Sequence, residues 1–205
     1  DHHLHFLRVS EPRKLTLISA ALPALPGASA MGAAAVDLNA DGLTDVVISF
    51  GVIALELFEL GGHRDVVLMN RGHMRFETLV LEPSRVAFTN GITAADMDGD
   101  LRPDLVESID FSHFVGGGSR ILLNRTPPGA AEPIFVVSEY GYDEGTFGMG
   151  AAVDDINGDG YIDIYNTSFG LDLMVYGQPD GSFKDVTEAS GFLHEWGNAG
   201  EGATP

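Results

Sequence analysis

Acidic residues recur along this chain at a fixed interval. Three nine-residue segments align, and their first acids, Asp37, Asp96 and Asp155, are separated by 59 residues both times. Oxygen-bearing side chains stand at positions 1, 3, 5 and 9, where they and the position-7 carbonyl can converge on one point. Calcium takes six to eight oxygens at about 2.3–2.6 Å and tolerates irregular geometry. The spacing therefore predicts Ca²⁺ loops. The expected ligands are Asp37, Asn39, Asp41, the Leu43 carbonyl and Asp45; Asp96, Asp98, Asp100, the Arg102 carbonyl and Asp104; and Asp155, Asn157, Asp159, the Tyr161 carbonyl and Asp163.

The second loop departs from the pattern at position 6. The first and third loops have Gly42 and Gly160 there, where the chain must turn sharply and a positive φ is expected. The second loop has Leu101, followed by Pro103. A side chain is disfavoured at positive φ, so this site is expected to be distorted or weaker.

Two other interpretations of the acidic loops remain open. Asp, Asn and Gly are good turn formers, so the loops could be metal-free connections between strands. However, two carboxylates about 4 Å apart repel by about 4 kcal/mol at an effective dielectric of 20, which favours a cation. An EF-hand would require helical flanks and a Glu at position 12, where these loops have Ile48, Glu107 and Asn166. Magnesium is disfavoured because it demands stricter octahedral geometry.

The segments around each loop read as β-strands. A small, apolar stretch precedes each loop and a β-rich stretch follows it. Two further strand-like runs come next, with a turn between them. Four short strands per 59 residues are typical of a propeller blade. We therefore predict an all-β fold, a partial β-propeller of about three and a half four-stranded blades that forms part of a seven-bladed ring. The expected units are residues 1–30 (end of a preceding blade), 31–89, 90–148 and 149–192 (three blade repeats), and 193–205 (start of the next blade or a tail).

The number of repeats is too small to close a propeller, which needs about four to eight blades. The sequence is thus expected to be a fragment, although two copies of 205 residues nearly equal seven steps of 59 and could close a ring together. Residues 13–30 resemble a signal peptide, with a basic start and an apolar middle. Pro23 and Pro26 interrupt that run, so a closing strand at Lys14 to Ser19 is preferred.

Composition narrows the classes of function. Thirty acidic residues against eleven basic ones give a formal charge of −19, which argues against a nucleic-acid partner. The absence of Cys excludes disulfides, thiolate metal sites and a Cys nucleophile. The sequence has no apolar run of the roughly 18 residues needed for a transmembrane segment.

The repeats resemble those of the FG-GAP/VCBS family, which occur in integrin-α-type β-propellers and in bacterial secreted proteins. The likeness lies in Phe147-Gly-Met-Gly-Ala151 before an acidic loop, in the Leu-x-Asn-Arg elements at Leu68 and Leu122, and in the strand from Asp180 to Thr187. It covers about residues 14–192. The resemblance implies the propeller fold and calcium binding, whereas family members serve adhesion, glycan binding, assembly and enzymes.

The sequence offers little catalytic chemistry, and we expect no enzyme activity. His194-Glu lacks the second His of a zinc protease, and the glycines before Ser119 lack the Lys of a phosphate loop. A histidine cluster at His2, His3 and His5 could bind a transition metal, although terminal residues are more often unstructured. Aromatic residues near loops are expected either in the core or on a sugar- or protein-binding face: Phe111, Phe114, Tyr140, Tyr142, Phe147 and Trp196.

The favoured function is that of a calcium-stabilised, extracytoplasmic propeller that serves as a protein-interaction or structural subunit of a larger assembly. Micromolar calcium sites are filled only where calcium is abundant, which is outside the cytosol. Two alternatives are a carbohydrate-binding module and an accessory domain of an enzyme that cleaves polysaccharides or phospholipids.

Overall fold

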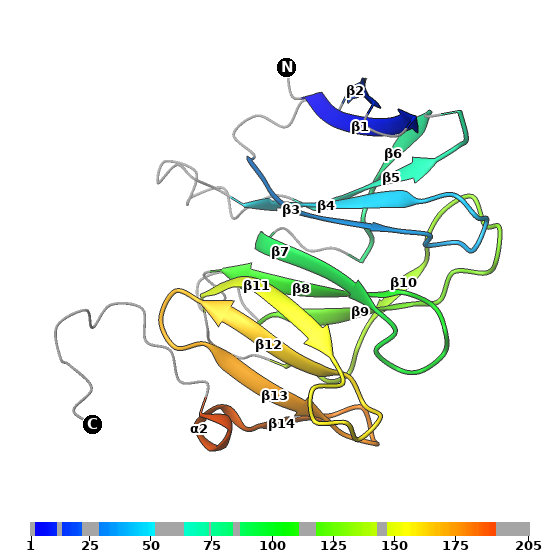
Figure 1. Ribbon diagram of the computed structural model, residues 1–205. Helices are drawn as coiled ribbons and strands as arrows, with labels where there is room; N and C mark the ends of the chain where they lie inside the picture. The colour runs from blue at the N-terminus through cyan, green and yellow to red at the C-terminus, as the bar shows by residue number, and fades with distance from the viewer. Residues whose placement is uncertain are drawn as a thin grey trace, which may run out of the picture.

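The protein is built almost entirely of antiparallel β-sheets. The computed structural model describes residues 3–11, 14–21, 29–51, 64–73, 75–83, 87–110, 118–142 and 147–191. These residues form three four-stranded sheets and one two-stranded sheet, with one short helix (Figure 1). The prediction of an all-β fold is confirmed.

Each four-stranded sheet is a meander in which consecutive strands pair. The first sheet contains β3 (Ser29–Val36), β4 (Asp45–Gly51), β5 (Val66–Asn70) and β6 (Phe76–Val80). The second contains β7 (Phe88–Ala95), β8 (Asp104–Asp110), β9 (Arg120–Asn124) and β10 (Phe135–Val137). The third contains β11 (Gly148–Asp154), β12 (Asp163–Ser168), β13 (Leu173–Gly177) and β14 (Phe183–Asp185).

The two-stranded sheet precedes the three repeats. It pairs β1 (His3–Glu11) with β2 (Lys14–Ala21), so the segment with signal-peptide character contains a strand where the repeat alignment expects one. A short helix, α2 (Thr187–Ser190), follows β14 and is absent from the expectations drawn from the sequence. Residues 193–205, Phe111, Phe114, Trp196 and His2 lie outside the described residues.

The sheets succeed one another face to face (Figure 1). Clusters of buried apolar side chains lie between them. Strands alternate their side chains between two faces, so the inner sheets need apolar residues on both. One cluster fills the space between the first and second sheets and includes Val47, Val67, Met69, Ile92, Leu105, Leu122 and Phe135. Another joins the second and third sheets and includes Val106, Ile121, Tyr142, Ile164 and Val175.

The first strands of the three sheets lie side by side, with β7 against both β3 and β11. Small residues make this approach possible. A Cβ placed on Gly91 would lie 2.7 Å from the Gly150 Cα, a distance that side-chain carbons do not tolerate. A β-bulge occurs at the same place in each strand, next to Gly32, Gly91 and Gly150. The small, apolar stretch before each acidic loop therefore serves the contact between sheets.

Among the described residues, no helix is long and apolar enough to cross a membrane.

Candidate metal centre

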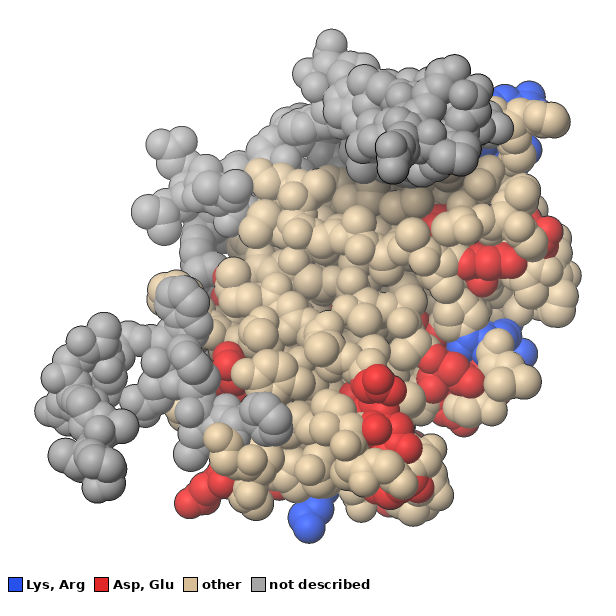
Figure 2. Space-filling model, in the orientation of Figure 1, with Lys and Arg blue, Asp and Glu red and all other residues tan. Residues whose placement is uncertain are grey.

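The three acidic loops occupy equivalent places in the fold. Each joins the first strand of a sheet to the second, and all three lie toward the same side of the molecule (Figure 1). Acidic side chains gather along that side of the surface (Figure 2). Strands flank every loop, so the EF-hand alternative, which requires helices, is wrong.

The carboxylate at position 1 organises the turn. Asp37 accepts hydrogen bonds from the backbone N–H groups of Asp41 (3.1 Å) and Gly42 (2.9 Å). Asp155 accepts from the equivalent groups of Asp159 (3.0 Å) and Gly160 (2.9 Å). These bonds hold the loop closed, because an ionised carboxylate accepts several N–H donors at once.

The carboxylate at position 5 also accepts a backbone hydrogen bond within the loop. Asp41, Asp100 and Asp159 each accept a hydrogen bond from the N–H group two residues later, at 2.8, 2.9 and 3.0 Å. The donors are the position-7 residues Leu43, Arg102 and Tyr161, whose carbonyls are the expected backbone ligands. The position-7 residue of each loop is thus fixed relative to the carboxylate at position 5.

The aspartate at position 9 connects the loop to the sheet. Asp45, Asp104 and Asp163 are all fully buried. One oxygen of each accepts from the N–H group at position 2, at 2.8–3.0 Å. The other accepts from the N–H group at the end of the third strand, at 2.7–2.9 Å. We call these three residues the position-9 aspartates. Each carboxylate retains at least one lone pair that could bind a cation.

The second loop brings three carboxylates together. Oxygens of Asp96, Asp98 and Asp104 lie within 4.8 Å of one another, an arrangement that could hold a metal ion. Within the described ranges, groups of three carboxylates approach this closely only here. The first and third loops have Asn39 and Asn157 at position 3, whose side-chain amides donate to Asp41 (3.1 Å) and Asp159 (3.0 Å).

Two buried oxygen atoms in these loops fit a cation. The Oδ1 atoms of Asn39 and Asp96 are buried and accept no hydrogen bond. An oxygen removed from water without a donor is costly, and a metal ion would supply the missing interaction. Both atoms belong to expected ligands, at position 3 of the first loop and position 1 of the second. The donor set consists of oxygen atoms, which suits a hard cation.

The electrostatics of two position-9 aspartates, Asp45 and Asp104, also favour a cation. Burial raises the pKa of Asp104 to about 6. Two backbone N–H donors lower this pKa, and the nearby carboxylates Asp98 and Asp100 raise it. Burial likewise raises the pKa of Asp45. A bound cation would oppose both effects because it stabilises the ionised carboxylate.

Two arginines offset part of the charge in the second loop. Arg125, at the end of the third strand of that sheet, bonds to Asp100 (2.7 Å) and also pairs with Asp98. Arg102 pairs with Asp100 through its side chain. From the sequence, only the Arg102 carbonyl was expected at this loop, and the presence of Arg125 there was not predicted. Its one signal was the Leu-x-Asn-Arg element that ends at Arg125.

The first loop is held against the second sheet. The Asn39 side chain donates to the Ala130 carbonyl (2.7 Å), and Gly129 donates its N–H to the Asn39 carbonyl (2.6 Å). The buried Asn124 side chain donates to the Leu38 carbonyl (2.9 Å). The geometry of the first loop therefore depends on the packing of two sheets as well as on its own residues.

Two positions in each loop have left-handed backbone conformations. At position 6, φ is +84° for Gly42, +65° for Leu101 and +93° for Gly160, as the alignment predicts. At position 4, Gly99 and Gly158 are equivalent to Ala40, which has a φ of +53°. The strain at Leu101 comes without compensating packing, because its side chain is 91% exposed.

We expect Leu101→Gly to raise the free energy of unfolding by about 0.5–1 kcal/mol. Glycine removes the steric cost of a side chain at positive φ, and this gain exceeds the cost of the greater conformational entropy that glycine gives the unfolded chain. Urea unfolding in calcium-free buffer would measure the change. The matched control is Ile156→Gly, at another exposed loop position where φ is not positive, which should lower stability. A loss of stability in Leu101→Gly would contradict the prediction.

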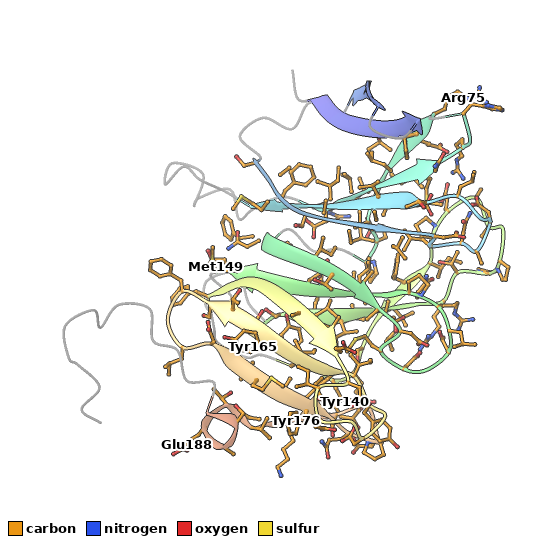
Figure 3. All side chains as sticks on the ribbon, viewed as in Figure 1. Arg75, Tyr140, Met149, Tyr165, Tyr176 and Glu188 are labelled. Carbon is orange, nitrogen blue, oxygen red and sulfur yellow. The ribbon has the colours of Figure 1, made fainter. Side chains whose placement is uncertain are left out.

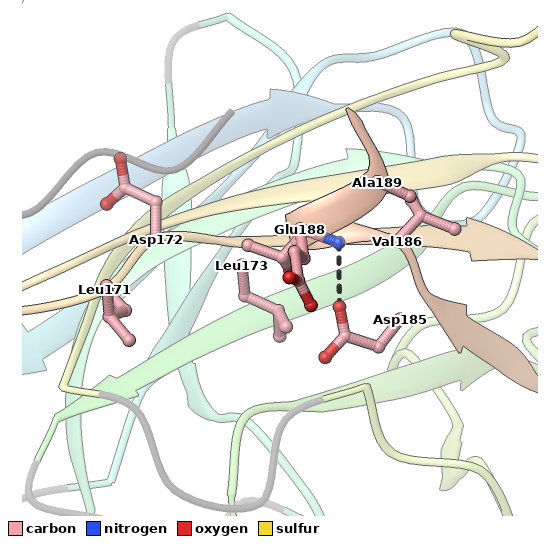
Figure 4. A pocket seen from close by; sticks show the side chains of 8 residues that line it. Leu171, Asp172, Leu173, Asp185, Val186, Glu188 and Ala189 are labelled. Carbon is pink, nitrogen blue, oxygen red and sulfur yellow. Dashed lines mark hydrogen bonds between the residues drawn. The ribbon is translucent and has the colours of Figure 1, made fainter. Parts of the chain in front are cut away.

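A separate concave surface lies beside α2. A cavity of about 760 Å³ is lined mainly by Leu171, Leu173, Val186 and the carboxylates Asp172, Asp185 and Glu188 (Figure 4). Asp185 accepts from the Thr187 N–H (2.8 Å). Asp172 accepts from the Tyr165 hydroxyl (2.6 Å), which raises the pKa of Tyr165 to about 12. The first two carboxylates are thus held by structural hydrogen bonds.

The aromatic residues expected near loops have different environments. Tyr142 is buried between the second and third sheets, where its hydroxyl donates to the Glu107 carbonyl (3.1 Å). Tyr140 is 39% exposed and lines a smaller cavity of about 240 Å³ (Figure 3). The described aromatic residues therefore divide between core and surface.

No protein-family model matches the chain, and the curated proteins contain no detectable relative. The likeness to FG-GAP/VCBS repeats remains a prediction from the residues quoted above.

Proposed function

We propose that the chain is a calcium-stabilised part of a β-propeller and serves as a protein-interaction or structural subunit of a larger, extracytoplasmic assembly. One observation carries this proposal: three equivalent oxygen-rich loops join the first and second strands of three equivalent sheets at 59-residue intervals. The blade-like arrangement is supported by the contacts of β7 with both β3 and β11. The resemblance to FG-GAP/VCBS repeats supports the same interpretation.

Calcium is the ion that suits these loops best. The ligands are carboxylate, amide and carbonyl oxygens, and their number leaves room for one or two waters. In the second loop, Arg125 competes with an ion for the Asp98 carboxylate, and Leu101 strains the turn. We therefore assign tighter binding to the first and third loops.

The proposed partner surface is the face of the third sheet that points away from the second. Ile164 and Val175 face the second sheet, so Tyr165 and Tyr176, which follow them, lie on the opposite face (Figure 3). The equivalent face of the second sheet carries Val106 and is buried against the third. Nearby, Phe169 and Leu171 are 71% and 52% exposed. Apolar side chains on such a face favour packing against another sheet or protein.

Calorimetric titration of calcium into protein stripped with EDTA tests the proposal. We expect two sites with micromolar dissociation constants and a weaker third. Asp159→Asn should remove one of the tight sites by replacing a ligand carboxylate. The matched control is Asp154→Asn, which makes the same change at an exposed residue just before the third loop and should leave the stoichiometry intact. Absence of any binding to the folded protein would refute the proposal.

A further inference from the structure

Two acidic side chains lie within the apolar contact between the first and second sheets. Asp65, which precedes β5, is 1% exposed, and Glu107, in β8, is fully buried. Asp65 lies away from the first acidic loop, because it bonds Phe50 near the end of β4 and the loop precedes the start of that strand. Glu107 stands three residues after Asp104 in β8. Buried carboxylates are rare unless they are paired, so Asp65 and Glu107 are each expected to have a partner.

The two carboxyl groups contact each other. Asp65 lies against the Glu107 carboxyl and the Thr89 side chain, and its Oδ1 accepts from the Phe50 N–H (2.9 Å). Glu107 Oε2 pairs with Arg120, the neighbouring residue on β9. Glu107 Oε1 is buried and receives no N–H or O–H donor from the described residues. Two ionised carboxylates are acceptors only, so a hydrogen bond between them requires a proton.

The charges around the pair lead to the same conclusion. Arg120 supplies one positive charge against two carboxyl groups. Asp110, further along β8, accepts a hydrogen bond from the Asn90 side chain (3.1 Å) and brings a further negative charge to that end of the sheet. Burial, and next the charge of Glu107, raises the pKa of Asp65 well above its usual range. One proton would leave the pair with a single negative charge, which Arg120 balances.

We infer that Asp65 and Glu107 share one proton at neutral pH, so that the contact between the first two sheets is a proton-binding site.

At the equivalent positions, the contact between the second and third sheets has neutral residues and needs no proton. Asn166 stands 59 residues after Glu107 and accepts from the Ser108 hydroxyl (2.9 Å). Ser119 precedes β9 as Asp65 precedes β5, and its Oγ accepts from the Ile109 N–H (2.9 Å). Neutral groups thus replace both acids in the contact between the second and third sheets. Of these two contacts, only the one between the first and second sheets binds a proton.

The proton links stability to pH with a definite sign. The folded protein holds a proton that the unfolded chain releases above the ordinary pKa values of Asp and Glu, near 4. Stability from this pair is therefore fully present below that range and is lost as pH rises through the raised folded pKa. While the pair keeps its proton, the folding equilibrium constant should fall about tenfold per pH unit from this site.

Unfolding in urea between pH 5 and 9, at saturating calcium, tests the inference with Asp65→Asn. The asparagine amide can donate to Glu107 and accept from the Phe50 N–H, so no proton is needed. We expect the ratio of wild-type to variant folding constants to fall about tenfold per pH unit over the window in which the pair is protonated. The matched control is Asp172→Asn. Asp172 precedes β13 as Asp65 precedes β5, but it contacts the Tyr165 hydroxyl rather than a second acid, so the wild-type pH slope should remain.

Infrared spectroscopy provides a second readout that does not depend on stability. The folded wild type at pH 7.5 with calcium should show the C=O band of a protonated carboxyl group, and the band should be lost in Asp65→Asn. If that variant does not fold, Asp65→Ser, which copies Ser119, replaces it. An unchanged pH slope in the variants, or no protonated band in the wild type, would overturn the inference. So would a band lost when sodium or calcium is added, because a cation would then neutralise the pair.

Discussion

Replacing Asp163 by alanine should lower the free energy of unfolding by about 3–4 kcal/mol even without calcium. Asp163 is fully buried and accepts hydrogen bonds from the N–H groups of Ile156 (2.9 Å), Asn157 (3.2 Å) and Gly177 (2.9 Å). Alanine leaves these donors without an acceptor, and each hydrogen bond to a charged group is worth about 1.5–3 kcal/mol. The midpoint of urea unfolding in EDTA would measure the loss.

Asp159→Ala is the matched control for this prediction. Asp159 is an expected ligand of the same loop, but it is exposed and its hydrogen bonds stay within the loop. In EDTA its replacement should cost about 1 kcal/mol or less, whereas with calcium both variants should be strongly destabilised. Equal losses in EDTA would contradict the prediction, because the buried hydrogen bonds of Asp163 would then add no more stability than those of Asp159.

Removing calcium should lower the melting temperature of the wild type by roughly 10–20 °C. At calcium concentrations about 100 times the dissociation constant, each occupied site adds about 2.7 kcal/mol, so the two tighter sites add about 5 kcal/mol. For a chain of this size, 1 kcal/mol corresponds to roughly 2–4 °C. The carboxylates left without a cation also repel one another.

Differential scanning calorimetry in calcium and in EDTA would measure this shift. Magnesium at the same concentration is the control and should restore little of the loss, because these loops do not offer it strict octahedral geometry. A melting temperature that is the same in calcium and EDTA would leave the loops as metal-free turns.

The sequence alone determined the features that depend on short-range physics. Alternating apolar residues and turn formers placed the strands of every repeat, including the strand from Lys14. The alignment of Leu101 with two glycines predicted its positive φ, because the backbone of a tight turn fixes this angle whichever residue occupies it. The expected oxygen ligands of each loop follow from residue type and spacing, and the carboxylates of three of them lie close together in the second loop.

Only the tertiary structure decided which side chains meet across the sheets. Arg125 reaches Asp98, 27 residues earlier, because the third strand of the sheet returns beside the loop. Asp65 and Glu107 meet because two sheets present particular faces to each other. Spacing predicts the position-9 aspartates as loop ligands, whereas their burial and hydrogen bonds make them anchors for two backbone segments. Spacing along a strand fixes the face on which a side chain lies, whereas the partner opposite that face depends on how the sheets pack.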